Sequence, residues 1–122
     1  MNQPITRQQH GIIEFIFIPL VAAAPALAGF TNEKTAAPLA RVLSGGILTA
    51  SLLTRAEWGL VRVIPYRVHL ATDTVVGLLT MTTPWLFGFA RNVRARNTFL
   101  AIGVSAALAG MLSKRGEMPA YQ

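Results

Sequence analysis

Residues 69–89 form an apolar run that is long enough to cross a lipid bilayer as one helix. At about 1.5 Å per residue, such a run extends roughly 30 Å, the thickness of a hydrocarbon core. The only charged residue in the run is Asp73, one turn inside its beginning, and a Pro-Trp pair lies near its end. A second long run, residues 11–30, also contains a single charged residue, Glu14. These runs predict a helical membrane protein.

The composition points to the same class of protein. Only 13% of the 122 residues are charged and 52% are hydrophobic, whereas about a quarter of the residues of a soluble domain are charged. The net charge of +6 comes from basic residues between the apolar runs, where Lys and Arg contact lipid headgroups. No basic helix face or aromatic platform predicts nucleic-acid binding. The lack of cysteine excludes disulfides and thiolate metal sites.

Two more apolar runs, residues 39–54 and 98–112, give a predicted total of four crossings, the last one extended into the preceding loop. The segment 59–68 either continues the second crossing or forms a short helix on the membrane surface. Trp58 and Trp85 are expected to anchor the chain at opposite membrane interfaces. Small residues allow membrane helices to approach closely, and the candidate packing positions are Gly45, Gly46, Gly103, Ala107 and Gly110.

A shift of 59 residues reveals an internal duplication. The pattern His-x3-acid-x10-Pro-x-Leu-x-Gly-Phe begins at His10 and again at His69. Apolar runs match each other easily by chance at Leu and Ala, but not at His, a carboxylate, Pro and Gly together. The first repeat covers about residues 10–55 and the second about residues 69–114. Because the first run is copied later in the chain, where no signal could be, a cleaved signal peptide is not expected.

Each repeat contains two crossings, so both repeats enter the membrane from the same side. The predicted fold class is all-α, a membrane-spanning four-helix bundle of two parallel two-helix repeats that form one domain over residues 1–122. The two termini and the central segment then share one side. Lys and Arg are divided six to five between the two sides, so their distribution does not orient the protein.

The end of the third run resembles a known family, the SPW-repeat family of small bacterial membrane proteins. The resemblance rests on His69, Asp73, Gly77 and the segment Thr83-Pro84-Trp85-Leu86-Phe87-Gly88-Phe89. The hallmark of the family is a Ser-Pro-Trp triplet at the end of a membrane helix. Here Thr83 stands in place of the Ser, and the first repeat keeps only Pro25 of the triplet. The resemblance implies a multi-helix protein of the bacterial cytoplasmic membrane and no catalytic site.

His10/Glu14 and His69/Asp73 are the candidate polar pairs within the membrane. A spacing of four residues places both members of a pair on one helix face. If the first and third crossings pack around the two-fold axis, the four groups converge and could ligate Zn²⁺. Their position near helix ends that water can reach, and the lack of the Glu-x-x-His signature of di-iron bundles, favour no metal and no cofactor.

The simplest interpretation of these pairs is structural. Each His would bond its own carboxylate, and Glu14 and Asp73 would cap the adjoining loop or pair with an arginine on the same side of the membrane, the candidates being Arg7, Arg62 and Arg67. Such pairs would set the angle between the two repeats.

No nucleophile–base pair, phosphate loop or cofactor motif occurs in the chain, so an enzyme is not expected. The prediction is a protein that acts by association, as an accessory subunit of a larger membrane complex or as a homo-oligomer. Its partners would be membrane lipids and other membrane subunits or copies of itself. The alternative is a small transporter, or a protein that conducts ions or protons, using Glu14 and Asp73, because carboxylates within a membrane are costly and often functional.

Overall fold

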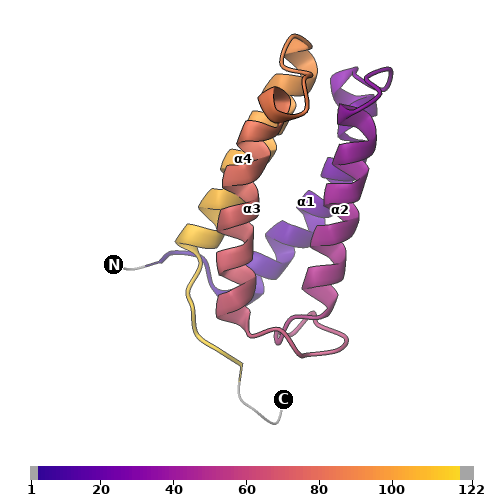
Figure 1. Cartoon of the computed structure of the whole chain (residues 1–122). Helices are drawn as coiled ribbons and strands as arrows, with labels where there is room; N and C mark the ends of the chain where they lie inside the picture. Colours follow the sequence, from indigo (N-terminus) through magenta and orange to yellow (C-terminus); the bar gives the residue numbers. More distant parts are fainter. Residues whose placement is uncertain (1–2, 119–122) are drawn as a thin grey trace.

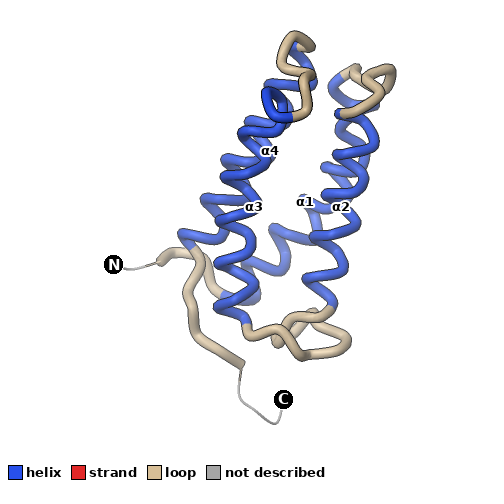
Figure 2. The backbone as a smooth tube through the Cα atoms, viewed as in Figure 1, coloured by secondary structure: helices blue, strands red, loops and turns tan. Residues whose placement is uncertain are grey.

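The computed structural model describes residues 3–118, which form four helices and no β-strand (Figures 1 and 2). The helices are α1 (Arg7–Ala28), α2 (Ala36–Leu52), α3 (Tyr66–Leu86) and α4 (Val93–Leu112). They form two hairpins, α1–α2 and α3–α4, whose tips lie at one end of the molecule, here termed the hairpin end. The loop 53–65 and the described residues before α1 and after α4 lie toward the opposite end. The predicted all-α bundle of two parallel repeats is confirmed.

The connection between the two hairpins differs from the expectation. Residues 53–65 are an irregular loop, so the segment 59–68 neither continues the second crossing nor forms a separate surface helix. The loop folds back onto the end of α2, where the N–H groups of Val63 and Ile64 donate to the carbonyl of Leu53 at 3.0 and 2.8 Å. These bonds satisfy a carbonyl that the end of a helix leaves open. The fourth helix does extend into the preceding loop, as expected.

The repeat motif encodes the end of the first helix in each hairpin. Gly29 and Gly88 follow α1 and α3 with φ angles of 79° and 78°, a left-handed conformation that glycine adopts without steric cost. The next residue, Phe30 or Phe89, donates its N–H to the carbonyl of the motif proline at 2.8 Å. The shared Pro-x3-Gly-Phe sequence is therefore a helix-termination signal that turns the chain into the hairpin.

The second hairpin is packed more tightly than the first because glycines face each other in it. A Cβ atom on Gly77 would lie 2.6 Å from the carbonyl oxygen of Gly103, and one on Gly103 would lie 2.5 Å from that of Gly77. The aligned residues in the first hairpin are Ile18 and Ser44, and the Ser44 hydroxyl donates to the Ile18 carbonyl at 2.8 Å. In the first hairpin, side chains thus lie between the two helices at the position where, in the second hairpin, α3 and α4 touch through their backbones.

Apolar side chains cover the outside of the bundle as well as its interior. Phe30, Phe89 and Phe99 are buried together near the hairpin end. Large apolar side chains are also exposed on every helix, with examples at Ile12, Leu48, Leu79 and Met111. By length and composition, α1 and α4 could each cross a bilayer, while α2 is apolar but shorter. A surface of this kind suits contact with lipid.

Candidate functional site

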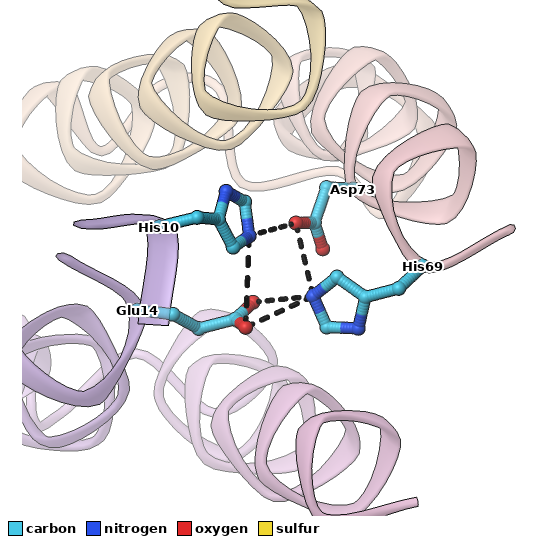
Figure 3. A group of neighbouring side chains, drawn as sticks. All are labelled: His10, Glu14, His69 and Asp73. Carbon is cyan, nitrogen blue, oxygen red and sulfur yellow. Dashed lines mark hydrogen bonds and ion pairs between the residues drawn. The ribbon is translucent and has the colours of Figure 1, made fainter. Parts of the chain in front are cut away.

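Four polar side chains of α1 and α3 meet inside the bundle, and Figure 3 shows them pointing toward one another. They are His10, Glu14, His69 and Asp73, here termed the central cluster. One nitrogen or oxygen atom from each lies within 4.8 Å of the others. His10, Glu14 and His69 are buried, and the Asp73 side chain is 12% exposed. The two-fold arrangement of the repeats therefore brings both candidate pairs to one place.

Each histidine lies closer to the carboxylate of the other repeat than to its own. His10 Nε2 is 3.0 Å from Asp73 Oδ2 and 3.7 Å from Glu14 Oε2. His69 Nε2 is 2.9 Å from Glu14 Oε2 and 3.3 Å from Asp73 Oδ2 (Figure 3). The interpretation in which each His bonds its own carboxylate is wrong in its main contact, because α1 and α3 face each other through these side chains and the opposite carboxylate lies nearer.

The arginines do not neutralise the cluster carboxylates. Arg7 forms a bidentate pair with Glu57 in the loop, at 2.7 and 3.0 Å. Arg67 Nε lies 3.4 Å from Glu117 in the C-terminal segment, and Arg62 donates to backbone carbonyls of its own loop. The expected pairing with arginine is therefore wrong, since all three side chains are engaged outside the bundle by groups of the loops and tail.

The cluster is also closed to water on the side where access was expected. The Trp58 ring lies 6.2 Å from the His10 ring, nearly parallel to it, and the Tyr66 ring lies 5.9 Å away, edge-on. Gly11 makes this approach possible, because a Cβ atom there would collide with the Trp58 ring. Trp58 thus covers the cluster, whereas Trp85 is 59% exposed on α3 near the hairpin end.

Two hydroxyl groups complete the cluster. His10 Nδ1 lies 2.8 Å from Ser113 Oγ, and His69 Nδ1 lies 2.8 Å from Thr54 Oγ1. Each hydroxyl is also 2.6 Å from the backbone carbonyl oxygen four residues earlier, which can only accept a hydrogen bond. The single hydroxyl hydrogen is donated to that carbonyl, so the hydroxyl oxygen accepts the Nδ1–H. In both histidines, Nε2 then faces the carboxylates.

Sequence reasoning assigned no role to these hydroxyls. The available signal was the duplication, which aligns Thr54 with Ser113 just as it aligns His10 with His69. A hydroxyl that recurs in register with a recurring His is a candidate partner for it. The partners are exchanged between the repeats, since His10 bonds the hydroxyl of the second repeat and His69 that of the first.

A cavity of about 50 Å³ adjoins the cluster. His10, Glu14 and Asp73 border it, and the rest of its wall comes from side chains of α1, α2 and α4, namely Ile13, Phe17, Ile47, Ser105, Ala106 and Ala109. This volume can hold more than one water molecule, and the carboxylates supply polar partners for it.

The family model for the SPW repeat domain matches residues 8–113. The chain belongs to the SPW repeat family. The predicted resemblance is confirmed, and together with the two helices that could cross a bilayer it indicates a small membrane protein. No curated protein and no solved structure matches the chain. The matched region of this SPW repeat protein includes the whole central cluster and both hydroxyl groups.

Two further carboxylates stabilise the loop and tail of this SPW repeat protein. The hydrogen bond from Arg7 lowers the pKa of Glu57 below its usual value. Glu117 accepts the backbone N–H groups of Tyr66 and Arg67 at 2.9 and 2.8 Å and so caps α3, whose own N-cap residue, a proline, makes no side-chain cap. Burial raises the pKa of Glu117, but the bonds from these N–H groups outweigh it and leave the pKa lowered.

Proposed function

We propose that this SPW repeat protein is not an enzyme and acts by association within the bacterial cytoplasmic membrane. It would serve as an accessory subunit of a larger membrane complex or as a homo-oligomer. The observation that supports this role is an apolar groove of about 330 Å³ between α2 and α3. On this proposal the partners are membrane lipids and the transmembrane helices of other subunits or copies, and nucleic acid is not a partner.

On its α2 side the groove is lined by the small residues Gly46 and Ala50 among larger apolar side chains. The two hairpins are joined by the central cluster and by contacts of α1 with α4, while α2 and α3 lie apart along most of their length (Figure 1). Val42, Gly46 and Ala50 of α2 face Thr72 and Val76 of α3 across the groove. Helices in lipid associate through close packing at small residues, because lipid provides no hydrophobic driving force. A transmembrane helix of a partner suits this groove.

The glycines of α2 and α4 differ in their surroundings. A Cβ atom on Gly45 or Gly46 would meet no atom within 4 Å. In contrast, a Cβ atom on Gly103 or Gly110 would lie 2.5 or 2.6 Å from a backbone carbonyl oxygen of α3, and Ala107 is buried at the same contact. The small residues of α4 therefore serve packing within the chain, and those of α2 remain open to a partner.

The test is the mass and composition of the particle extracted gently from its native membrane. We expect the chain to co-purify with other chains in a fixed ratio or to form a defined oligomer. Gly46→Leu places a larger side chain in the groove, at a position where an added Cβ atom meets no atom within 4 Å, and should release the partner. Ala101→Leu, on an exposed position of α4, is the matched control and should not. A monomer in mild detergent and in lipid nanodiscs would contradict the proposal.

The second candidate function is conduction of protons or ions, and the position of Asp73 favours it. Asp73 borders both the cavity beside the cluster and the groove between α2 and α3. The double variant Glu14→Gln/Asp73→Asn separates the two functions in proteoliposomes. Loss of flux with intact assembly would support conduction, whereas loss of assembly would support a structural role. Glu57→Gln, outside the cluster, is the control.

A further inference from the structure

We propose that the central cluster binds one divalent transition-metal ion, with Zn²⁺ as the best match. The four ligands would be Nε2 of His10 and of His69 and one carboxylate oxygen each of Glu14 and Asp73. The inference rests on the geometry of these groups and is independent of the groove between α2 and α3.

The nitrogen–oxygen distances between the donor atoms are close to those around a tetrahedral ion. With metal–ligand bonds of about 2.0 Å, neighbouring ligand atoms of a tetrahedral zinc site are about 3.3 Å apart. The four nitrogen–oxygen separations in the cluster are 3.0, 3.7, 2.9 and 3.3 Å. These four separations are thus near the spacing that a small ion requires, and the other two, between the nitrogens and between the oxygens, are at most 4.8 Å.

The two histidines are oriented as metal ligands are. In both, Nδ1–H is held by a hydroxyl group, so Nε2 faces the centre of the cluster. A histidine that ligates a metal usually donates its other N–H to such an outer group, which determines the tautomer and the ring orientation. Thr54 and Ser113 supply this outer group on the two sides of the site.

Two buried atoms at the centre lack a well-directed partner. Within residues 3–118, His10 Nε2 and Glu14 Oε2 are inaccessible to solvent and make no hydrogen bond of good geometry, although His10 Nε2 lies 3.0 Å from Asp73 Oδ2 and Glu14 Oε2 lies 2.9 Å from His69 Nε2. Buried polar atoms are nearly always satisfied, and an unsatisfied one needs an explanation. A metal ion bound by both atoms would provide it, and its two positive charges would balance the two carboxylates in an interior where net charge is costly.

The donor set selects the class of ion. Ca²⁺ and Mg²⁺ require six or more oxygen ligands, whereas the cluster offers two imidazole nitrogens and two carboxylates. Imidazole suits Zn²⁺ and its neighbours in the first transition row. The cluster supplies one ligand atom from each of four residues, which fits a single ion in a closed, tetrahedral site.

The experiment uses the full chain purified in detergent and treated with a chelator. We expect uptake of one Zn²⁺ per chain, a higher melting temperature with equimolar Zn²⁺ but not with Mg²⁺, and the visible absorption of tetrahedral Co²⁺ when Co²⁺ replaces zinc. X-ray absorption should show four nitrogen or oxygen neighbours at about 2.0 Å. Failure of the chain to take up Zn²⁺ would overturn the proposal.

Variants connect the ion to these residues. His69→Gln should abolish uptake, and binding of Zn²⁺ by this variant as tightly as by the natural chain would overturn the proposal. Because His69→Gln removes a buried group, a milder variant is needed as well. Thr54→Val removes only the outer hydroxyl and should weaken Zn²⁺ binding about 10- to 100-fold. Thr49→Val is the matched control, since the Thr49 hydroxyl bonds a carbonyl of its own helix and contacts no histidine. Equal Zn²⁺ affinity of the Thr54 and Thr49 variants would contradict the proposed site.

Discussion

His10 Nδ1, near the beginning of α1, lies 2.8 Å from the hydroxyl of Ser113, which directly follows α4. The same bond, at the same length, joins His69 to Thr54. Each bond connects one repeat to the other, and the two are exchanged by the two-fold relation of the repeats. These polar contacts therefore join the two hairpins at the end of the bundle that contains the loop 53–65. The rest of the interior is largely apolar.

Ser113→Ala should destabilise the protein. The substitution removes the acceptor of the His10 Nδ1–H group, and a buried donor without a partner costs about 1–3 kcal/mol. We expect a lower melting temperature in detergent with unchanged helix content. Thr49→Ala is the control, because its hydroxyl is exposed and bonds only within α2. The same melting temperature for both variants would show that the bond between the repeats contributes nothing.

Gly103→Val should separate α3 from α4. The added Cβ would lie 2.5 Å from the carbonyl oxygen of Gly77, so the helices must move apart, and overpacking of this kind costs about 1–3 kcal/mol or more. Gly45→Val is the matched control, since its Cβ meets no atom within 4 Å. Thermal unfolding should distinguish the two variants, and a loss of stability at Gly45 alone would contradict the observed packing.

The ion pair of Arg7 and Glu57 should make the stability of the fold depend on pH in the acidic range. The pKa of Glu57 is lower in the folded chain than its usual value, so the pair stabilises the fold above the unfolded pKa of about 4.3, and this contribution disappears as the pH falls through the lower folded pKa. Melting temperatures between about pH 6 and pH 3 should fall less steeply for Glu57→Gln. Arg7→Gln should have the same effect. If the dependence of melting temperature on pH were unchanged in both variants, the Arg7–Glu57 pair would not be the source of the acid sensitivity.

Cysteine labelling should place the two chain ends on one side of the membrane. The natural chain has no cysteine, so a thiol reagent can label only the one cysteine that is introduced. Gln8→Cys and Gly116→Cys are at exposed positions near each other, since Arg7 bonds the carbonyl of Gly116, and Lys34→Cys is in the exposed turn between α1 and α2. An impermeant reagent should label positions 8 and 116 from one side and position 34 from the other. Labelling of positions 8 and 116 from opposite sides would exclude the four-crossing fold.

Local features of the sequence were sufficient for the fold class. The lengths of the apolar runs predicted four helices, and the duplication predicted two equivalent two-helix repeats. The structure added that the glycine of the repeated Pro-x3-Gly-Phe pattern is left-handed and ends the first helix of each hairpin. The spacing of His10 from Glu14 and of His69 from Asp73 placed each pair on one helix face. The prediction failed at residues 53–65, where hydrogen bonds to the end of α2 replaced any local helical preference.

The sequence by itself thus determined a helical membrane protein made of two parallel repeats, together with the four polar residues worth inspecting. Tertiary structure alone decided which groups they contact. The His69–Glu14 contact joins residues 55 positions apart, and the His10–Ser113 bond joins residues 103 positions apart. Helical periodicity orders side chains only within one helix, whereas the approach of α1 to α3 depends on how all four helices pack. That packing buried the cluster, engaged the arginines elsewhere and left the groove between α2 and α3 open.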